Sequence, residues 1–371
     1  MLLFNNMKPV KLILIALIFM GCSKPLTIVV NNPSLDERTE VMAELPVGAL
    51  NFTKEDIGKY RLLDENKQEV PYQILYWGTE DPQRIIFLVD NIRGGMQRQY
   101  TWRKGNPSPV EPRVSAQFVP ERKDDFAWEN DNAAYRMYGP ALAPENPSNG
   151  VDLWLKCTDK PIVTQFYDDD LHHNRPYHIN YGEGLDCYKV AHTLGCGGIA
   201  PYVDGHLQVG NHYEEWKILE EGPLRVQFML TYPTHKLFIT CDAGSLLNKA
   251  EVYREQEAES NSQWAAGIFL HDKMDNVSFS EQGGWLAYAE NAVSDAGVHQ
   301  GRNYCAVVAD HVQAIQVQDQ HLLAILPATE PATYYFGGGW SQWRYPEDAD
   351  WFSAVARFAR NADKKLKCKV Q

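Results

Sequence analysis

The segment Gln165–Gly198 concentrates side chains that can move protons or bind cations. Its 34 residues hold four of the chain's eleven histidines, together with four tyrosines and five Asp or Glu. Few apolar residues interrupt it, so we expect an ordered polar loop and not a core element. Imidazole, carboxylate and phenol groups together are typical of acid–base chemistry or of a metal site. The segment therefore predicts an enzyme, without naming its substrate.

Tyr181, Glu183 and Asp186 form the most specific pattern in this segment, within the run YGEGLDCY. The glycines of the run allow a sharp turn or a close approach of the backbone to a ligand. A tyrosine can act as a base where a nearby cation lowers its pKa from about 10. We predict that Tyr181 and Glu183 are catalytic and that Asp186 binds substrate. The alternative is that both carboxylates only accept hydrogen bonds from the backbone amides of their own loop.

His172, His173 and His178 lie close in sequence to the acidic run Asp168–Asp170. Three imidazoles and three carboxylates are enough ligands for a divalent metal ion. Their spacing matches no metal motif of defined geometry, however. We therefore favour proton transfer by His173 and His178 over a divalent metal site, and we predict no metal ligands.

A second polar cluster, ERKDDFAWENDN, occupies residues 121–132 ahead of a strand-like run, Ala133–Met137. Acidic, basic and aromatic side chains at this density can form the wall of a charged pocket. We predict substrate contacts for Arg122, Trp128 and Glu129. The alternative is a solvated loop whose ions pair with one another.

Arg136 differs from this cluster because it alternates with apolar residues along the run Ala133–Met137. In a strand, such alternation directs Arg136 and Ala134 to the same side of the sheet. A buried arginine needs a carboxylate partner, and a substrate carboxylate held by two parallel hydrogen bonds would provide one. We therefore predict that Arg136 is catalytic.

Trp340 follows three glycines, Gly337–Gly339, in a run that also contains Trp343 and Arg344. The run is compatible with a flexible aromatic lip that stacks on a sugar ring, and equally with a plain loop ahead of the last helix. On the first interpretation Trp340 binds substrate. The aromatic content of 12% also suits sugar binding, although large β-proteins are rich in Tyr and Trp as well.

Short β-rich runs must position these side chains, because helical periodicity is missing from most of the chain. Such runs, separated by Asn, Pro, Gly and Asp turns, lie at residues 26–30, 40–46, 70–76 and 84–89. They predict a small β-sandwich over residues 26–103. A linker with three prolines follows at residues 104–113.

Alternating runs recur beyond this linker and predict a second, larger all-β domain over residues 114–371. They lie at residues 151–155, 224–230, 236–240, 285–288, 304–308 and 321–325. One helix is expected, at residues 349–361, where five apolar residues recur at helical spacing. These are Trp351, Phe352, Val355, Phe358 and Ala359.

The first residues predict export from the cytoplasm. Lys8 and Lys11 precede an apolar run, Leu12–Met20, that is too short to span a bilayer. The run ends at a glycine followed by Cys22, which resembles the lipobox of bacterial lipoproteins, where the cysteine is lipidated. We expect removal of residues 1–21 and attachment to the outer membrane through Cys22, on the periplasmic side. The alternatives are the cell surface and a plain secretory signal.

The chain carries a net charge of −13, and removal of residues 1–21 with their two lysines makes it about −15. This charge disfavours nucleic acid as a partner. An anionic substrate would need a local basic pocket. The six cysteines after Cys22 show neither a zinc-finger nor a disulfide-scaffold pattern, which leaves room for one or two disulfides.

Two strings give the chain a resemblance to a known family. Residues 118–142, FVPERKDDFAWENDNAAYRMYGPAL, and 181–198, YGEGLDCYKVAHTLGCGG, resemble a domain-of-unknown-function family of secreted bacterial proteins. Its members are common in Bacteroidetes, in gene clusters for polysaccharide breakdown. The similarity runs from about Leu26 to near Asp348. It implies a galactose-mutarotase-like β-supersandwich, similar to the β-domains of polysaccharide lyases.

The resemblance also implies an activity, that of a dehydratase on oligosaccharides from uronate-containing glycans such as ulvan. Elimination of water across C4–C5 of a terminal uronate needs a cation on the carboxylate, a base for the C5 proton and an acid for the departing hydroxyl. The candidates for these three roles are, in the same order, Arg136 or Arg122, Tyr181 or His173, and His178 or Glu183.

Other activities on the same glycans stay open. A polysaccharide lyase would use the same chemistry, with a sugar as leaving group. A glycoside hydrolase would need paired carboxylates, which Asp125 or Glu129 with Glu183 or Asp186 could supply. A non-catalytic glycan-binding lipoprotein would use the aromatic residues and need no base.

Overall fold

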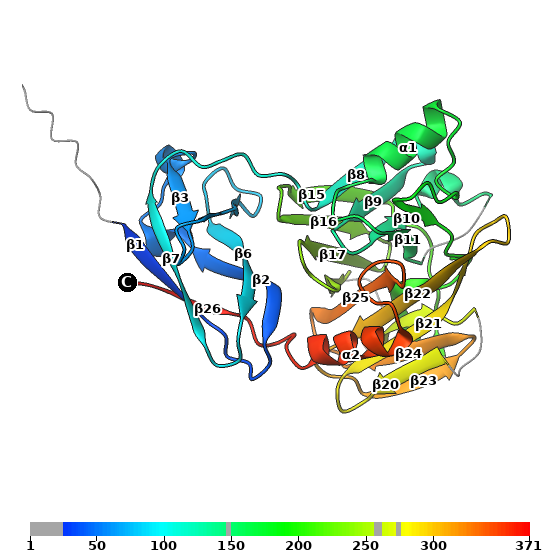
Figure 1. Cartoon of the computed structure of the whole chain (residues 1–371). Coiled ribbons are helices and arrows are strands. Elements are labelled where there is room, and N and C mark those ends of the chain that lie inside the picture. Colours follow the sequence, from blue (N-terminus) through cyan, green and yellow to red (C-terminus); the bar gives the residue numbers. More distant parts are fainter. Residues whose placement is uncertain (1–24, 146–149, 256–261, 272–275) are drawn as a thin grey trace, which may run out of the picture.

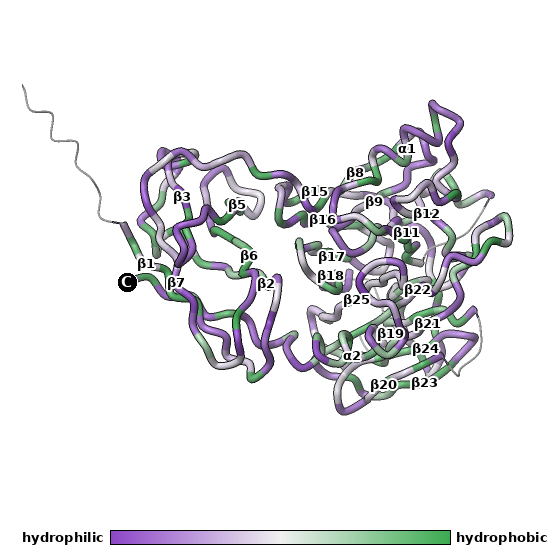
Figure 2. Tube along the Cα trace, in the orientation of Figure 1, coloured by the Kyte–Doolittle hydropathy of each residue, from purple (hydrophilic) through white to green (hydrophobic). Residues whose placement is uncertain are grey.

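The computed structural model describes residues 25–145, 150–255, 262–271 and 276–371. These residues form two β-rich parts that lie side by side (Figure 1). The prediction of an all-β protein is confirmed: a small β-sandwich precedes a larger β-supersandwich, and a short helix lies near the C-terminus. Hydrophobic residues gather along the strands of both parts, whereas the connecting loops are mostly hydrophilic (Figure 2).

Two sheets pack face to face in the smaller part. The five-stranded sheet has the order β26 (Lys367–Val370), β1 (Leu26–Asn31), β7 (Gln97–Lys104), β3 (Tyr60–Leu63) and β4 (Glu69–Val70), and the three-stranded sheet has the order β2 (Arg38–Pro46), β6 (Arg84–Ile92) and β5 (Tyr72–Leu75). Alternate strand residues such as Ile28, Phe87 and Trp102 are buried between the sheets. Pro71 separates β4 from β5, because proline cannot donate to a ladder.

The C-terminal strand β26 corrects the predicted domain boundary. The sequence-based boundary assigns residues 114–371 to the second domain, but β26 pairs antiparallel with β1, with Val370 opposite Ile28 and Lys367 opposite Asn31. The chain therefore returns to the smaller part at its end (Figure 1). The run KCKV is too short and too polar to reveal this pairing by its pattern.

One large sheet forms the floor of the larger part. Its eight strands have the order β15 (Glu215–Glu220), β16 (Arg225–Thr231), β17 (His235–Asp242), β18 (Asn248–Arg254), β25 (Ala332–Trp340), β22 (His299–Val308), β21 (Trp285–Val293) and β20 (Val277–Ser280). Gly337–Gly339 and Trp340 belong to β25, so the predicted flexible lip or loop is wrong at these residues.

Two further sheets pack on the inner face of this floor. One has the order β12 (Gly184–Asp186), β11 (Asp152–Lys156), β10 (Ala134–Met137), β9 (Asp125–Glu129) and β8 (Ser115–Val119), and the other has the order β14 (His206–Leu207), β13 (Cys196–Val203), β19 (Gln263–Phe269), β24 (His321–Leu326) and β23 (Ala314–Gln318). A single apolar core joins the three sheets, with Trp128, Phe228 and Ile268 among its members.

Helix α2 (Asp348–Ala359) confirms the predicted C-terminal helix. It lies against β21 and β22, and its Trp351 and Val355 are fully buried. Helix α1 (Val163–His172), by contrast, was not predicted, and it occupies the start of the expected loop Gln165–Gly198. It packs an apolar side on the outer face of the sheet β8–β12. The expectation of a single helix is therefore wrong.

The predicted export signal and Cys22 lie outside the described residues. Within the described ranges, no helix combines the length and the apolar character needed to cross a membrane. The six described cysteines are free thiols, so the one or two disulfides that the sequence left open are not formed.

Candidate functional site

The outer face of the sheet β8–β12 carries both polar clusters that the sequence singles out. Alternate residues of a strand share a face, so Asp125 on β9, Arg136 on β10 and Asp152 on β11 lie on the same side. The strand registers place Arg136 opposite Asp152, and Asp186 on β12 opposite Trp154. Four charged side chains from four neighbouring strands therefore meet at one end of this face.

Arg136 lies at the centre of these side chains and is 2% exposed. Its Nε donates to Asp152 Oδ2 at 2.8 Å, and its Nη2 donates to Asp186 Oδ2 at 2.8 Å. Nη1 donates to Tyr177 Oη at 3.1 Å, and Nη2 also donates to Tyr138 Oη at 3.0 Å. With Asp125, whose Oδ2 lies 3.5 Å from Nη1, these residues make up the Arg136 cluster: Asp125, Arg136, Tyr138, Asp152, Tyr177 and Asp186.

These contacts contradict the prediction that Arg136 binds a substrate carboxylate. Three protein carboxylates and two phenols already surround its guanidinium, so no donor is left for a ligand. Asp186 is likewise buried and held by Arg136, so it does not bind substrate directly. A fully bonded buried ion network fixes the positions of its members. The geometry therefore gives Arg136 and Asp186 a structural role, which is to hold the site in place.

Burial raises the pKa of Asp186 well above its usual range, and the neighbouring Asp152 raises it further. Burial also raises the pKa of Asp125 to about 6. Asp152 accepts hydrogen bonds from Arg136, from Trp154 Nε1 and from its neighbour's backbone, which makes it the charge partner of Arg136. The positive charge of Arg136 opposes the rise in both pKa values.

The two tyrosines of the Arg136 cluster are not bases. Burial raises the pKa of Tyr138 well above its usual range, and burial raises that of Tyr177 as well. Both phenols stay protonated at neutral pH, where their oxygens accept from Arg136.

His178 connects this buried cluster to the solvent. Its side chain is 38% exposed, and its Nδ1 lies 3.0 Å from the backbone oxygen of Asp186 and 3.7 Å from Oδ2 of that residue. A carbonyl oxygen can only accept, so Nδ1 carries the hydrogen, and Nε2 keeps its lone pair when the ring is neutral. The ring also packs on Tyr177, with centroids 4.6 Å apart. His178 is therefore an oriented imidazole that can accept a proton.

Arg122 contacts the same tyrosine from the short helix η3 (Pro120–Arg122). It is half-buried, and its Nε donates to Tyr177 Oη at 2.9 Å. In contrast to Arg136, no carboxylate of the described residues lies within ion-pair distance of Arg122. A half-buried guanidinium without a protein carboxylate is suited to an anionic ligand.

A strained turn positions Arg122 ahead of β9. Lys123 and Asp124 adopt left-handed backbone angles, with φ of 56° and 63°, which are unfavourable for residues other than glycine. Tyr213 Oη donates to the backbone oxygen of Asp124. Gly139 packs so closely on that oxygen that a Cβ atom there would overlap it. The turn is thus held from two sides, and Gly139 is required by this close approach.

Three predicted catalytic residues, Tyr181, His173 and Glu183, are exposed. The ring of Tyr181 lies under the guanidinium of Arg175, with 4.2 Å from Cζ to the ring centroid. His173 lies at the end of α1, and its Nδ1 is 3.3 Å from Asp168 Oδ2. Over the described ranges, no hydrogen bond or ion pair joins these three side chains to the Arg136 cluster. The structure brings together His178, Asp186, Arg136 and Arg122, but not these three.

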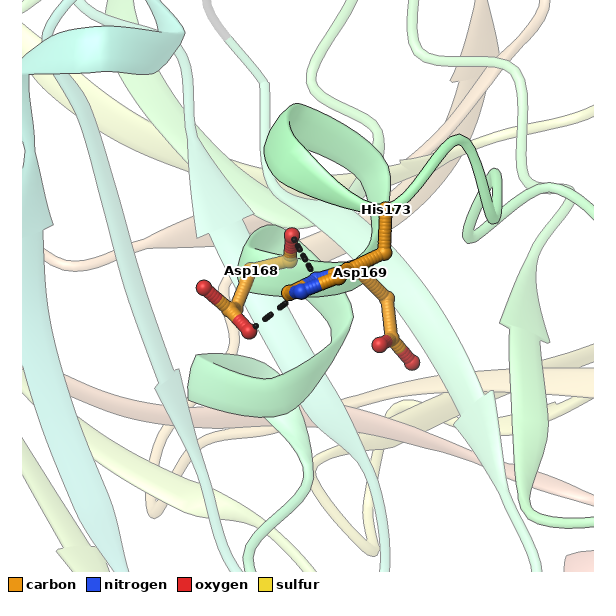
Figure 3. A group of neighbouring side chains, drawn as sticks. All are labelled: Asp168, Asp169 and His173. Atoms are coloured by element: carbon orange, nitrogen blue, oxygen red, sulfur yellow. Dashed lines mark hydrogen bonds and ion pairs between the residues drawn. The ribbon is translucent and has the colours of Figure 1, made fainter.

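Asp168, Asp169 and His173 form a group of metal-ligand type at the end of α1 (Figure 3). One potential ligand atom of each lies within 4.8 Å of the others. Asp169, however, already accepts hydrogen bonds from Arg175 Nη1 at 2.5 Å and from Gln165 Nε2 at 2.9 Å. The guanidinium next to this carboxylate would repel a metal cation. The geometry therefore does not favour a divalent metal site at Asp168, Asp169 and His173.

The structure contradicts the predicted substrate contacts of Trp128 and Trp340, because both are buried. Trp128 is 0% exposed, and its Nε1 donates to Asn248 Oδ1 at 3.2 Å. Trp340 is 1% exposed, and its Nε1 donates to the backbone oxygen of Gln300 at 2.5 Å. Both indoles are core residues with satisfied N–H groups and cannot stack on a sugar.

Glu129 is also buried, at 0% exposure, which contradicts its predicted contact with substrate. It forms an ion pair with Lys156 Nζ at 2.7 Å and accepts from the backbone N–H groups of Ile162 and Val163. Glu129 thus binds the N-terminus of α1, where a negative charge is favourable. The hydrolase alternative loses support for the same reason, because its proposed carboxylates Asp125, Glu129 and Asp186 all have buried protein partners.

Sequence reasoning missed several residues of the site. Asp152 lies on the predicted strand at residues 151–155, and its alternation with Trp154 is the signal that could have placed it on the face that Arg136 occupies. Tyr138 and Tyr177 gave no signal of their own. His271 and Glu290 form another imidazole–carboxylate pair, which the sequence did not predict.

His271 Nδ1 lies 3.1 Å from both carboxylate oxygens of Glu290. Burial lowers the pKa of His271, but the hydrogen bond that its ring donates to Glu290, the charge of that carboxylate and a bond to the backbone oxygen of Lys189 together raise it. His271 follows β19 and Glu290 lies on β21, and no motif joins the two positions. Only the tertiary structure brings the two side chains together.

Comparisons with known proteins support the fold. Residues 30–368 match the family described as Domain of unknown function (DUF4861). A relative from Formosa agariphila, "Uncharacterized protein P7", is 28% identical over 280 residues, which cover 69% of this chain and 69% of that protein.

Solved structures give a more distant likeness. A protein in the glycosyl hydrolase family 38 from Enterococcus faecalis has a TM-score of 0.54 at 10% identity, over 94% of this chain and 47% of that one. An α-mannosidase from Enterococcus faecalis V583 has a TM-score of 0.45 at 10% identity, over 94% and 46%. This chain thus spans about half the length of these structures, and the first likeness shows the fold alone. The family match covers nearly the whole chain, which belongs to the family described as Domain of unknown function (DUF4861).

Proposed function

We propose that this protein is a carbohydrate-active enzyme that forms a 4,5-unsaturated uronate at the non-reducing end of uronate-containing, ulvan-like oligosaccharides by eliminating water. The observation that carries the proposal is the placement of His178 and Arg122 against the same side chain, Tyr177. An oriented imidazole and a guanidinium without a protein carboxylate are the two groups that such a β-elimination needs.

Arg122 would bind the substrate carboxylate. The C5 proton of a uronate is only weakly acidic, because its removal places negative charge on the carboxylate as an enolate. A guanidinium that bonds the carboxylate oxygens neutralises the ground-state charge and stabilises the charge that develops. The bond from Nε to Tyr177 leaves the Nη groups of Arg122 for this role.

His178 would move the proton. Its neutral ring takes the C5 proton on Nε2, because Nδ1 is fixed by the backbone oxygen of Asp186. The imidazolium then returns this proton to the C4 hydroxyl, which leaves as water while the C4–C5 double bond forms. The proton therefore leaves C5 and ends in the water molecule, and no other reactant is needed. In this assignment His178 replaces Tyr181 and His173 as the base.

One incubation distinguishes the proposed dehydratase from a glycoside hydrolase and from a glycan-binding protein. Purified protein is incubated with saturated, uronate-terminated oligosaccharides, and ultraviolet absorbance of the conjugated double bond is followed together with chain length. We expect new absorbance without shorter chains. Absorbance with shorter chains would indicate a lyase that releases a sugar. New reducing ends without absorbance would indicate a hydrolase, and retention without products a binding protein.

We also propose that the mature protein is anchored to the outer membrane by lipid on Cys22, on the periplasmic side. The basic residues, the short apolar run and the following cysteine support this proposal. Mass spectrometry of the mature N-terminus is the test, with Cys22→Ala as the matched variant. A mature protein that begins at another residue, without lipid, would contradict it.

A further inference from the structure

A second candidate site shares no lining residue with the Arg136 cluster. It is a cleft of about 1070 Å³ between the smaller part and the outer face of the eight-stranded sheet. Its walls come from β2, from β16, β17 and β18, and from α2 with the segment that leads to β26. This interdomain cleft exceeds the upper end of the usual range for small-molecule pockets, about 300–1,000 Å³.

Most acidic side chains in the cleft have a cationic partner. Arg225 bonds Asp242 through Nε at 2.6 Å and Glu44 through Nη1 at 3.0 Å. Lys249 Nζ lies 2.8 Å from Glu251 Oε1. These pairs neutralise the floor of the cleft, so its net charge depends on the side chains at its rim.

The rim carries spare positive charge. Seven Lys or Arg but five Asp or Glu line the cleft, in a chain whose net charge is −13. No carboxylate of the described chain lies within ion-pair distance of Arg38, Arg357 or Lys365, all of which line it. Arg38 Nη1 instead donates to the backbone oxygen of Lys364 at 2.5 Å, which holds it beside Lys365. This local excess of positive charge is suited to an anionic ligand.

Neutral groups in the same cleft suit a sugar. Tyr253 is 40% exposed, and its ring meets that of Phe238 at 5.2 Å on the floor of the cleft. Exposed aromatic faces can stack on the apolar faces of pyranose rings.

The cleft is long enough for more than one sugar ring. Asp242 and Phe238 both line it from β17, four residues apart on the same face. At a strand rise of about 3.3 Å per residue, their Cα atoms are about 13 Å apart. We propose that the interdomain cleft binds an anionic oligosaccharide chain through Arg38, Arg357 and Lys365, with Tyr253 under a sugar ring. The inference rests on the proposed function only in taking this anion to be a uronate chain.

Binding of an oligogalacturonate to the full chain tests this inference by isothermal titration at low and high salt. A neutral oligosaccharide of equal length serves as the comparison. We expect the uronate to bind more tightly than the neutral glycan, and its affinity to fall with salt. The double variant Arg357→Gln/Lys365→Gln should bind about tenfold more weakly, because two charge-assisted contacts are lost. Arg103→Gln/Lys104→Gln, which changes the charge equally on exposed residues of β7, should bind like the wild type.

Equal affinity of the Arg357→Gln/Lys365→Gln variant and the wild type would overturn the inference. So would equal binding of the neutral glycan, or no uronate binding by the wild type. Tyr253→Ala provides a second variant that keeps every charge, and it should also weaken binding. The His178→Gln variant separates this site from the proposed reaction: it should bind the uronate chain normally. If the wild type binds the uronate chain normally but forms no unsaturated product, the proposed reaction is rejected and the proposed binding site in the cleft is retained.

Discussion

His178 is joined to Asp186 twice: its Nδ1 lies 3.0 Å from the backbone oxygen and 3.7 Å from the carboxylate of that residue. The same carboxylate accepts from Arg136 at 2.8 Å. A partly exposed imidazole is thus coupled to a buried network on four neighbouring strands. This arrangement separates residues that act on a ligand from residues that only hold the site, and the two groups should respond differently to substitution.

His178→Gln should lower the rate of uronate elimination by about 100-fold or more, because glutamine cannot take up the C5 proton. His173→Gln is the matched control, since the structure places that imidazole outside the Arg136 cluster, and it should retain activity within about twofold. Initial rates from absorbance of the unsaturated product decide between them. Loss of activity in His173→Gln with normal activity in His178→Gln would reverse the assignment.

Arg122→Gln should weaken substrate binding and lower kcat/KM by about 100-fold, because the substrate carboxylate loses its charged partner. Stability should change by no more than about 0.5 kcal/mol, since no protein carboxylate is left unpaired. Arg122→Lys keeps the charge but not the bond to Tyr177, so it should recover part of the activity. An unchanged kcat/KM in Arg122→Gln would remove Arg122 from the mechanism.

Arg136→Gln should instead destabilise the fold by about 3–5 kcal/mol, because it leaves buried carboxylates without their cation. Urea unfolding followed by tryptophan fluorescence measures this change. Arg103→Gln, on an exposed position of β7, is the control and should leave the midpoint unchanged. A normal midpoint for Arg136→Gln would show that the network is not needed for stability.

Asp125 should make stability depend on pH. Its pKa is about 6 in the folded protein and about 3.9 in the unfolded chain, so the folded state binds more protons between these values. The free energy of unfolding should therefore fall by up to about 3 kcal/mol as pH rises from about 4 to 6, and stay lower above that. Asp125→Asn should remove this fall, as measured by urea unfolding at several pH values. A variant that is less stable than the wild type at pH 8 would contradict this account.

Glu129→Gln should destabilise α1 and the larger part by about 3–5 kcal/mol, because Lys156 would be left buried and unpaired. The backbone N–H groups of Ile162 and Val163 would also lose their anionic acceptor. Glu121→Gln, on an exposed residue of η3, should have little effect. Hydrogen exchange of the α1 amides localises the change, and unaltered protection in Glu129→Gln would argue against this capping role.

The sequence by itself determined the strands and their faces. Short β-rich runs between turns predicted β1, β2 and β6, and alternation predicted β16 and β17, all close to their observed bounds, because both patterns are local properties of the chain. Helical spacing likewise predicted α2, whose Trp351 and Val355 are buried. The two polar clusters were also visible as sequence, and both contribute to the Arg136 cluster.

Helix α1 depended on tertiary structure. Its residues, VTQFYDDDLH, give a short and largely polar helix with no side-chain cap of its own. The anion at its N-terminus is Glu129, which lies 33 residues earlier in the chain. No local pattern can report a cap supplied from another strand.

The same limit separates the predicted site from the observed one. The sequence predicted Arg136, Glu129, Trp128 and Trp340 as site residues because they are charged or aromatic. It did not show whether the partner of each would be a substrate or another group of the protein. Strand register decides that question for Arg136, because it places Asp152 and Asp186 around the guanidinium. Residue types set which chemistry is available, and the pairing of distant strands decides which of these side chains still face a ligand.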